Sequence, residues 1–483
     1  MISQNLKKLF KEYPDKVLVI TFILMGLILL SIAILSPKFE YQIALEQKPV
    51  ILFVFLLFLA GVIYLSLFKI LPKINSSGIN IALILFAGLI LRLLFLFSTP
   101  ILEDDFYRYL WDGANLANGI NPYRIPPEMV INNTEEEINI PPIMKELAAE
   151  SGEIIHRINH PYVRTIYPVI TQLGFALAYL LQPWSLLAWK IVLLIVDVLF
   201  VVVLLAIFKK LKISPVWIAL YWWNPLLIKE IFNSGHMDIL IFPFLFLALF
   251  LSIKNNFIWA SVCLGLAANV KIWPVLLLPL ILKPLVKKPQ KMFFPLGLFA
   301  GLLLITIIPA NPLQDLSTSS FYNYSTRWQM NDSLFKIFHY FSQVIINFLK
   351  LEPGYSQILA RIMAMLVVLI TVVLVLLRKN TGKRALFENC LIIVSVLFLV
   401  SPTQFPWYYT WIIPFLCIQP RFSLLLLTPL LSLYYLRYYL MSINNELLFD
   451  NWLVWLQYIP VWILLLLEYL SSQKSKPQVK TIY

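Results

Sequence analysis

Long apolar runs separated by short polar breaks extend through almost the whole chain. An α-helix needs about 20 apolar residues to span the hydrocarbon core of a bilayer, so the pattern predicts an all-α, polytopic membrane protein with about 14 transmembrane helices. Their predicted ranges are 17–36, 49–70, 80–98, 186–208, 214–232, 239–253, 256–270, 272–286, 293–310, 357–378, 385–402, 407–420, 422–441 and 452–471. Residues 256–286 could instead form one broken unit, and 407–420 is short for a complete crossing.

One further apolar stretch, residues 165–182, determines the predicted topology. Its internal Pro168, Gln172 and Gly174 favour a helix that lies in the membrane interface over one that crosses the bilayer. With this stretch in the interface, the short basic loops all fall on one side, which the positive-inside rule makes cytoplasmic. Both termini are then expected inside, and the long polar segments are expected on the opposite, external face.

The whole chain, residues 1–483, is expected to form a single integral membrane domain. Residues 99–185 are predicted to be an external catalytic loop with juxtamembrane helices, because they contain the most acidic sequence in the protein. Residues 311–356 are predicted to be a second external loop with an amphipathic helix at 332–349. The cytoplasmic loops are short and leave no room for a P-loop or a dinucleotide-binding domain.

Composition supports a membrane protein and excludes other classes. Hydrophobic residues make up 60% of the chain and charged residues 13%, whereas a soluble domain carries about 25% charged residues. The net charge of +13 arises from basic loops between apolar runs, so it does not indicate nucleic-acid binding. The three cysteines lie in apolar runs and the four histidines form no metal motif. We therefore expect no disulfide framework and no metal-ligand spacing.

The most unusual polar sequence is Glu103-Asp104-Asp105, which follows an apolar run and precedes an aromatic segment. Carboxylates this close to a bilayer are costly unless they bind a cation or take part in proton chemistry. Either aspartate alone could simply cap a helix that begins here. Two adjacent aspartates plus Glu103 exceed what capping requires, and a carboxylate in a medium of low polarity can act as a general base. Asp105 and Asp104 are therefore the candidate catalytic residues.

Cationic side chains on the same face could bind an anionic group. Arg108 follows Asp105 by three residues and shares its helical face, so it either forms a local ion pair or anchors a phosphate. Lys271 divides two apolar runs, where it either snorkels to the interface or meets an anion. His236 and Asp238 follow another apolar run, and they either cap a helix or mark a site. These alternatives stay open at the level of the residues.

Aromatic residues near the predicted external face form two clusters, 322–328 and 407–411. Both could stack on a sugar, but an interfacial aromatic belt explains them equally well.

A series of motifs runs in a fixed order along residues 80–420. They are Asp105-x-x-Arg108-Tyr109-x-x-x-Gly113, Gly119-x-Asn121-Pro122-Tyr123, Tyr162-x-x-x-x-Tyr167-Pro168, Gly235-His236-x-Asp238, Lys271-x-x-Pro274, Trp328-x-x-Asn331-Asp332-Ser333 and Pro406-Trp407-Tyr408-x-x-Trp411-x-x-Pro414. In their order along the chain, and in the side of the membrane on which they are predicted to lie, these motifs resemble those of the GT-C superfamily of integral-membrane glycosyltransferases. The resemblance is closest to glycosyltransferase family 87 and related polyprenol-phosphate-mannose-dependent mannosyltransferases.

The resemblance implies an inverting transfer of a sugar, with mannose expected, from a polyprenyl-phosphate donor to an acceptor hydroxyl. Asp105 would be the general base, with Asp104 in reserve. The donor phosphate would contact Arg108, Arg164, His236, Lys271 and Arg327. The substrate would contact Tyr109, Asn121, Tyr167, Asp238, Trp328, Asn331, Trp407 and Tyr408. No cofactor and no obligatory metal is expected, although Glu103-Asp104-Asp105 could bind a divalent cation.

The expected partners are the lipid-linked donor, a lipid or glycan acceptor and membrane lipids, with no nucleic acid. The expected location is a bacterial inner (plasma) membrane, with the active site on the external face. Two other functions stay open. A transporter or flippase of lipid-linked or anionic solutes would need polar groups at mid-bilayer, where Asp197 is the main acid. A non-catalytic scaffold would not explain why acids, histidine and lysine converge on one side.

Overall fold

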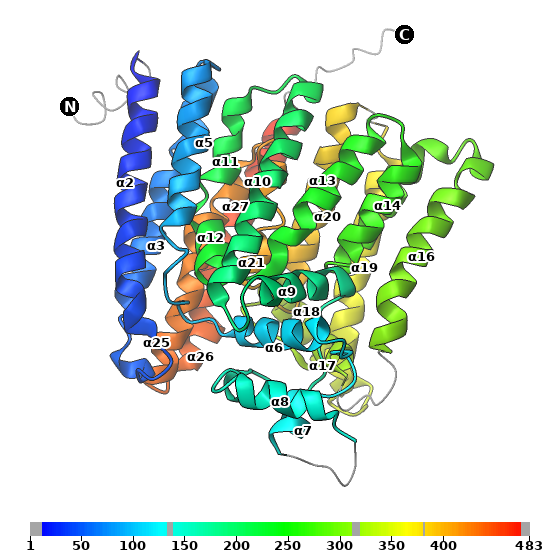
Figure 1. Ribbon diagram of the computed structural model, residues 1–483. Coiled ribbons are helices and arrows are strands. Elements are labelled where there is room, and N and C mark those ends of the chain that lie inside the picture. Colours follow the sequence, from blue (N-terminus) through cyan, green and yellow to red (C-terminus); the bar gives the residue numbers. More distant parts are fainter. Residues whose placement is uncertain (1–11, 133–138, 312–318, 380–381, 475–483) are drawn as a thin grey trace.

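The computed structural model describes residues 12–132, 139–311, 319–379 and 382–474. Within these residues the chain is helical and contains no strand; an isolated β-bridge joins Met330 and Thr403. Figure 1 shows long helices side by side in one bundle, with several short helices lying across its lower end. The predicted all-α class is confirmed.

The bundle contains every predicted span as helix. Its first part comprises α2 (Pro14–Leu35), α3 (Val50–Tyr64), α4 (Leu67–Ile70), α5 (Gly78–Leu93), α10 (Leu186–Leu211), α11 (Ala219–Trp222), α12 (Pro225–Ile228), a π-helical turn (Lys229–Asn233), a 3-10 turn (Met237–Leu240), α13 (Ile241–Ser252), α14 (Phe257–Ala268), α15 (Leu278–Leu282) and α16 (Phe293–Ala310). Its second part comprises α19 (Tyr355–Leu377), α20 (Lys383–Val400), α21 (Pro406–Tyr409), α22 (Ile413–Leu416), α23 (Phe422–Leu425), α24 (Leu427–Leu430), α25 (Leu436–Ser442), α26 (Glu446–Leu448) and α27 (Val454–Lys474).

Within the described residues, seven helices are long and apolar enough to cross a bilayer, so the chain is an integral membrane protein. They are Pro14–Phe39, Val50–Lys73, Leu186–Leu211, Pro289–Ala310, Tyr355–Leu377, Phe422–Ser442 and Glu446–Ser472. The pair Pro225–Asn233 and Met237–Ser252, bent by 101° at its break, makes an eighth if it is one span. The other predicted spans are shorter or broken helices, and fourteen complete crossings stay a prediction.

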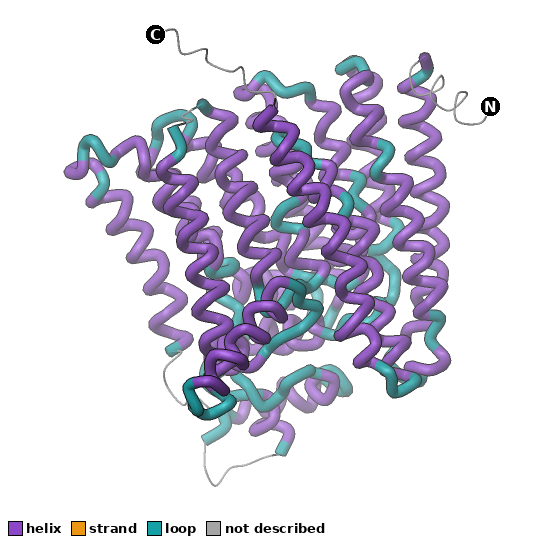
Figure 2. Tube along the Cα trace, turned by 180° about the vertical axis from the view of Figure 1, so that it is seen from behind, coloured by secondary structure: helices purple, strands orange, loops and turns teal. Residues whose placement is uncertain are grey.

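The polar breaks between helices gather at two opposite ends of the bundle. At one end, where α2 and α5 begin, Asn80 donates a hydrogen bond to Asp15. We call this end the terminal face, because α27 also ends there (Figures 1 and 2). At the other end Asn233 donates to Ser98. We call this end the loop face, because residues 99–132 and 139–185 lie there (Figure 1).

Basic residues gather at the terminal face. Arg384 donates to the carbonyls of Leu211 and Lys212 at the end of α10, and Lys283 donates to the carbonyl of Arg378. These contacts join loops between helices that were predicted from the sequence to be cytoplasmic. The observed distribution of charge agrees with the positive-inside rule, whereas the orientation in a particular membrane stays a prediction.

The helices at the loop face are short. They are α6 (Asp105–Ala117), α7 (Pro127–Ile131), α8 (Pro142–Glu150), α9 (Val169–Leu181), α17 (Ser320–Arg327) and α18 (Leu334–Phe348). Helix α9 corresponds to the predicted interfacial stretch 165–182, and Figure 1 shows it lying across the bundle. Helix α18 corresponds to the predicted amphipathic helix 332–349. Both predictions are confirmed as helices in those positions.

Helices α6 and α9 pack closely because a glycine lets their backbones approach. A Cβ at Gly113 of α6 would lie 2.5 Å from the carbonyl oxygen of Phe175 in α9, which is too close for any real contact. One helical turn earlier, Tyr109 stacks on the Phe175 ring with centroids 4.5 Å apart. This packing fixes the position of α6, and with it the two aspartates at its start.

A buried ion pair joins α5 and α10 inside the bundle. Arg92 Nε lies 2.5 Å from Asp197 Oδ2, and the Tyr221 hydroxyl donates to Asp197 Oδ1 at 2.5 Å. The Arg92 guanidinium also lies over the Trp222 ring, 3.5 Å from its centroid. Both oxygens of Asp197, the acid that a transporter would use at mid-bilayer, are therefore occupied within the bundle.

Candidate active site

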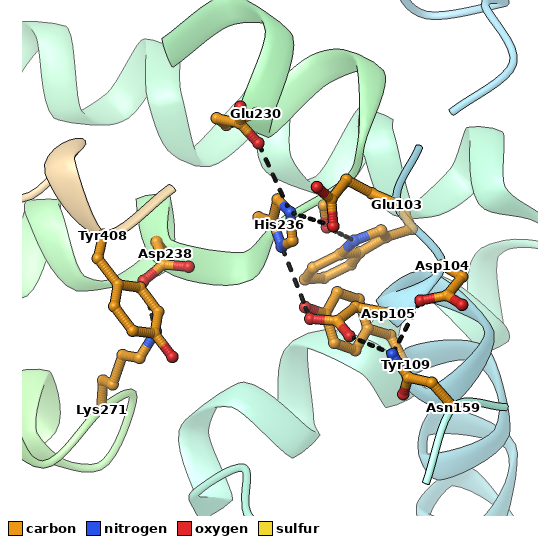
Figure 3. A network of polar contacts seen from close by, with 12 residues as sticks. Glu103, Asp104, Asp105, Tyr109, Asn159, Glu230, His236, Asp238, Lys271 and Tyr408 are labelled. Carbon is orange, nitrogen blue, oxygen red and sulfur yellow. Dashed lines mark hydrogen bonds and ion pairs between the residues drawn. The ribbon is translucent and has the colours of Figure 1, made fainter. Parts of the chain in front are cut away.

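The predicted pair of aspartates at the start of α6 is held by one amide. Asn159 Nδ2 donates to Asp104 Oδ1 and to Asp105 Oδ1, at 2.8 Å each (Figure 3). The Tyr109 hydroxyl donates to Asp105 Oδ2 at 3.4 Å. Asp104 directly precedes α6, but its side chain makes no capping hydrogen bond. Helix capping therefore does not explain the pair, since both carboxylates bind Asn159 instead.

His236 lies behind this pair, at the sharp break before α13. The break is possible because Gly235 adopts φ +81°, which favours glycine. His236 Nδ1 lies 3.8 Å from Asp105 Oδ2, and Nε2 lies 3.8 Å from Glu103 Oε2 and 3.6 Å from Glu230 Oε2 (Figure 3). The imidazole is thus surrounded by three carboxylates from different parts of the loop face.

Glu230 is anchored by a lysine and a tyrosine. Lys229 Nζ lies 3.5 Å from Glu230 Oε2, and the Tyr435 hydroxyl donates to Glu230 Oε1 at 2.5 Å. Lys229 also donates to the Tyr435 hydroxyl. One ligand atom each of Glu103, Glu230 and His236 lies within 4.8 Å of the others, so these three residues could hold a metal ion.

A second cation lies near Asp105. Lys271 Nζ lies 2.7 Å from Asp238 Oδ1, which also accepts a hydrogen bond from Trp411 Nε1 at 2.6 Å. The same ammonium group lies over the Tyr408 ring, 4.1 Å from its centroid. Asp238 and the two rings therefore hold Lys271 in place on the side of the cluster opposite Asn159 (Figure 3).

The charged groups of this cluster differ in their access to substrate. The side chains of Asp105 and Lys271 are 26% and 22% exposed, and Asp104 lies at the surface. In contrast, Glu230 and His236 are at most 1% exposed. A substrate can therefore reach a carboxylate and an ammonium group, while the remaining charges lie beneath them.

The surroundings raise the pKa of the three carboxyl groups that precede or begin α6. Burial is the main cause of the raised pKa of Glu103 and of Asp105. Asp104 lies at the surface, but the packed protein around it removes part of its hydration and raises its pKa to about 6, and the charge of Asp105 adds to this rise. The amide of Asn159 opposes the shift at both aspartates by donating to the charged form.

The structure brings many of the predicted site residues together. They are Asp104, Asp105, Tyr109, His236, Asp238, Lys271, Trp407 and Tyr408. Trp407 stacks on the His236 ring with centroids 4.1 Å apart. Tyr167 adjoins them through its ring contact with Tyr109 at 5.1 Å. Segments more than 300 residues apart in the chain therefore meet at one place on the loop face.

Other predicted residues support the loop instead of reaching the cluster. Arg108 donates to Asp112 at 2.9 Å and to the Val163 carbonyl at 3.0 Å, so it forms the local ion pair that the sequence left as one alternative. Arg164, which follows Val163, is buried. Asn121 accepts a hydrogen bond from the backbone amide two residues later and stabilises a turn.

Three more predicted residues lie around the 319–356 segment. Asn331 is buried and donates to the Gln404 carbonyl, so it ties this segment to the bundle. Trp328 contacts the His160 ring at 4.7 Å. Arg327 is exposed at the end of α17. Among the described residues, none of these three contacts the aspartates.

Several members of the cluster were not among the predicted site residues. Glu230 had a signal in the sequence, because Lys229 and Glu230 are adjacent charges within a predicted apolar span. Asn159 and Tyr435 had none, since each reaches the cluster only through folding over a long separation. Tyr435 follows Glu230 by 205 residues.

The described residues form an all-α, polytopic integral membrane protein, an architecture consistent with the GT-C type. A family model described as alpha-(1->6)-mannopyranosyltransferase, N-terminal domain, of the MptA_B family matches residues 17–287. The match covers more than half of the chain, so the chain belongs to this family. The predicted resemblance to membrane mannosyltransferases is confirmed. No curated protein and no solved structure matches the chain.

Proposed function

We propose that the protein transfers mannose from a polyprenyl-phosphate donor to a hydroxyl group of a lipid or glycan acceptor, with inversion at the anomeric carbon. Membership of a mannosyltransferase family supports the sugar and the reaction class. The observation that carries the mechanism is the pairing of an accessible carboxylate, Asp105, with an accessible ammonium group, Lys271, over a buried charged cluster.

Asp105 is the general base of this reaction. Its carboxylate is held by Asn159 and Tyr109, yet about a quarter of the side chain remains exposed. It removes the proton of the acceptor hydroxyl as that oxygen attacks the anomeric carbon. A single displacement of this kind breaks the bond to the donor phosphate and inverts the configuration. Asp104 has the same Asn159 partner but makes no contact with His236 among those described, so it is the reserve.

Lys271 stabilises the leaving group. As the sugar departs, the lipid phosphate gains negative charge, and a fixed cation at that position lowers the energy of the transition state. Asp238 and the Tyr408 ring orient the ammonium group before the substrate binds. Since Lys271 balances the phosphate, the transfer step itself needs no metal ion.

The position of α9 supports a lipid-linked donor. Gln172 and Phe175 on one side of this helix are buried, whereas Leu173, Leu177 and Leu180 are exposed. An interfacial helix with an exposed apolar side lies where the phosphate of a membrane lipid is found. Because the short basic loops gather at the terminal face, the loop face with this site is proposed to be external.

The test is transfer by purified protein from polyprenyl-phosphate-mannose to candidate lipid and glycan acceptors, with nucleotide-linked mannose as the comparison donor. We expect transfer from the lipid donor alone, with an inverted anomeric configuration in the product. Loss of transfer in Asp105→Asn, and its survival in Asp104→Asn, would identify the base. Full turnover in both variants would exclude an aspartate base, and transfer from the nucleotide donor would exclude the proposed donor.

A further inference from the structure

Three potential metal ligands converge beneath the proposed base. The Nε2 atom of His236 faces Oε2 of Glu230 at 3.6 Å and Oε2 of Glu103 at 3.8 Å. All three side chains are at least nine-tenths buried. They come from two separate segments, the end of the α5–α6 connection and the break before α13, so their convergence results from the fold and not from a local sequence motif.

The separations in this group are too long for hydrogen bonds. A hydrogen bond between an imidazole nitrogen and a carboxylate oxygen measures about 2.7–3.2 Å. Ligand atoms held tetrahedrally about 2.1 Å from a zinc ion lie roughly 3.4 Å from one another. The observed 3.6–3.8 Å separations are closer to the second arrangement. The space between the three side chains therefore suits one ion coordinated by all of them.

Each of the three side chains has a buried polar atom without a hydrogen bond in the described part of the chain; those of Glu230 and His236 face this space, and that of Glu103 is the other oxygen of its carboxylate. Within the described chain, Glu103 Oε1, Glu230 Oε2 and His236 Nε2 are buried and make no hydrogen bond. Buried carboxylate and imidazole atoms are costly when unpaired, so such a group in a native protein indicates a missing partner. Lys229 forms an ion pair with Glu230 Oε2 at 3.5 Å, but its hydrogen bond goes to Tyr435. Among the described residues, His236 Nε2 and Glu103 Oε1 stay without a hydrogen bond.

The charge of the cluster also favours a cation. Its five carboxylates are Glu103, Asp104, Asp105, Glu230 and Asp238, and its two lysines are Lys229 and Lys271. Fully ionised, these groups have a formal excess of three negative charges. A divalent cation removes most of this excess, and a buried site of low polarity strengthens that attraction.

We propose that Glu103, Glu230 and His236 bind one divalent transition-metal ion. An imidazole nitrogen with two carboxylates suits ions such as Zn²⁺ or Mn²⁺ better than Mg²⁺ or Ca²⁺, which prefer oxygen ligands alone. The sequence led to the expectation of no obligatory metal, with Glu103-Asp104-Asp105 as possible ligands of a divalent cation; the site proposed here instead combines Glu103 with Glu230 and His236. The ion lies behind the base and does not contact the donor phosphate.

The site is linked to Asp105 through the imidazole. A metal on Nε2 leaves the proton of the neutral ring on Nδ1, and Nδ1 faces Asp105 Oδ2 at 3.8 Å. Stacking on Trp407, with an interplanar angle of 15°, restricts rotation of the ring. His236 is therefore a positioning residue: it connects the ion to the carboxylate that we propose as the base.

The test measures metal content in full-length protein purified without a polyhistidine tag. After chelation and separate reloading with Zn²⁺, Mn²⁺ or Mg²⁺, we expect about one equivalent of Zn²⁺ or Mn²⁺ per chain and a raised melting temperature, but little Mg²⁺. X-ray absorption of the loaded wild type should show one imidazole nitrogen in the ligand shell. No retained Zn²⁺ or Mn²⁺, or a shell without imidazole, would overturn the site.

Substitutions of the three proposed ligands test whether these residues bind the ion. His236→Ala and the double variant Glu103→Gln/Glu230→Gln should retain less than about a tenth of the wild-type metal, given that loss of a ligand strongly reduces affinity. The control Glu128→Gln removes an exposed acid of the same loop and should bind metal as the wild type does. Equal binding by the double variant and the wild type would place the ion elsewhere. Because no donor or acceptor is present, this result is independent of the proposed sugar transfer.

Discussion

Two groups of buried charges in this protein differ in how completely their members are paired. In the Arg92–Asp197 pair, both carboxylate oxygens have partners at 2.5 Å, although Nη2 of the Arg92 guanidinium makes no hydrogen bond within the described chain. In the cluster around His236, the nearest carboxylates lie 3.6–3.8 Å away and several buried atoms have no hydrogen-bond partner within the described chain. The carboxylate of the first group is fully bonded within the protein, whereas the carboxylates and the imidazole of the second keep buried atoms that a ligand could bind.

This difference separates a structural from a functional use of charge. A buried pair whose carboxylate is fully bonded holds two helices in register and leaves no carboxylate oxygen free for a ligand. A cluster with accessible members, unpaired atoms and an excess of one charge is maintained at a cost in stability, which is typical of a site. Burial of charge alone would not have distinguished them, since both groups lie among apolar helices.

The largest expected effect is on catalysis in Asp105→Asn. The substitution keeps the size of the side chain and its bond to Asn159 but removes the proton acceptor, so the rate of transfer should fall about 100- to 10,000-fold. Initial rates with saturating donor measure this change. Asp104→Asn is the matched control and should lose less than about tenfold. The reverse order of the two variants would assign the base to Asp104.

The next effect is on stability and concerns the Arg92–Asp197 pair. Arg92→Met leaves Asp197 buried without its cation and should lower the free energy of unfolding by about 3–5 kcal/mol. The double variant Arg92→Met/Asp197→Leu removes both charges and should recover most of this loss. Thermal unfolding in detergent measures both. If transfer per folded molecule fell in the double variant, the pair would have a functional role after all.

Lys271→Gln should weaken donor binding and also slow the transfer step, because the proposed contact with the phosphate strengthens as the sugar departs. A hydrogen bond to a charged group contributes about 1.5–3 kcal/mol, so the KM for the lipid donor should rise about 10- to 100-fold. Lys271→Arg keeps the charge and should retain part of the affinity. Lys210→Gln, which removes an exposed lysine at the terminal face, is the control and should have no effect. An unchanged donor KM together with an unchanged rate of transfer in Lys271→Gln would remove Lys271 from the phosphate site.

The fold could be predicted from the sequence because bilayer-length apolar runs have a simple physical meaning. The helix at residues 165–182 was predictable as well, and its interfacial placement stays a prediction that rests on sorting all the basic loops to one side. The number of complete membrane crossings was harder to predict from the sequence. Segments such as 214–232 and 272–286 are interrupted by prolines, so each forms several short helices whose path depends on packing.

For the site, the sequence indicated which residue types would meet but not which of them would bond to one another. Asp105, His236 and Lys271 were found because charges next to apolar runs are rare. Arg108 was misleading, since its spacing from Asp105 equally allowed the partner that it has, Asp112. Asn159 carried no signal, because an asparagine in a polar loop is common and its role depends entirely on where the loop folds.

The smallest effect tests whether Asn159 positions the base. Asn159→Ala removes two hydrogen bonds of 2.8 Å, each contributing about 0.5–1.5 kcal/mol, so turnover should fall about tenfold with little change in donor KM. Asn159→Asp should be more damaging, because it places a third negative charge against Asp104 and Asp105. Asn118→Ala, which removes an exposed amide of the same loop, is the control. If Asn159→Asp turned over as fast as the wild type, the two aspartates would not need a neutral donor, and their close pairing would have to be stabilised by a bound cation instead.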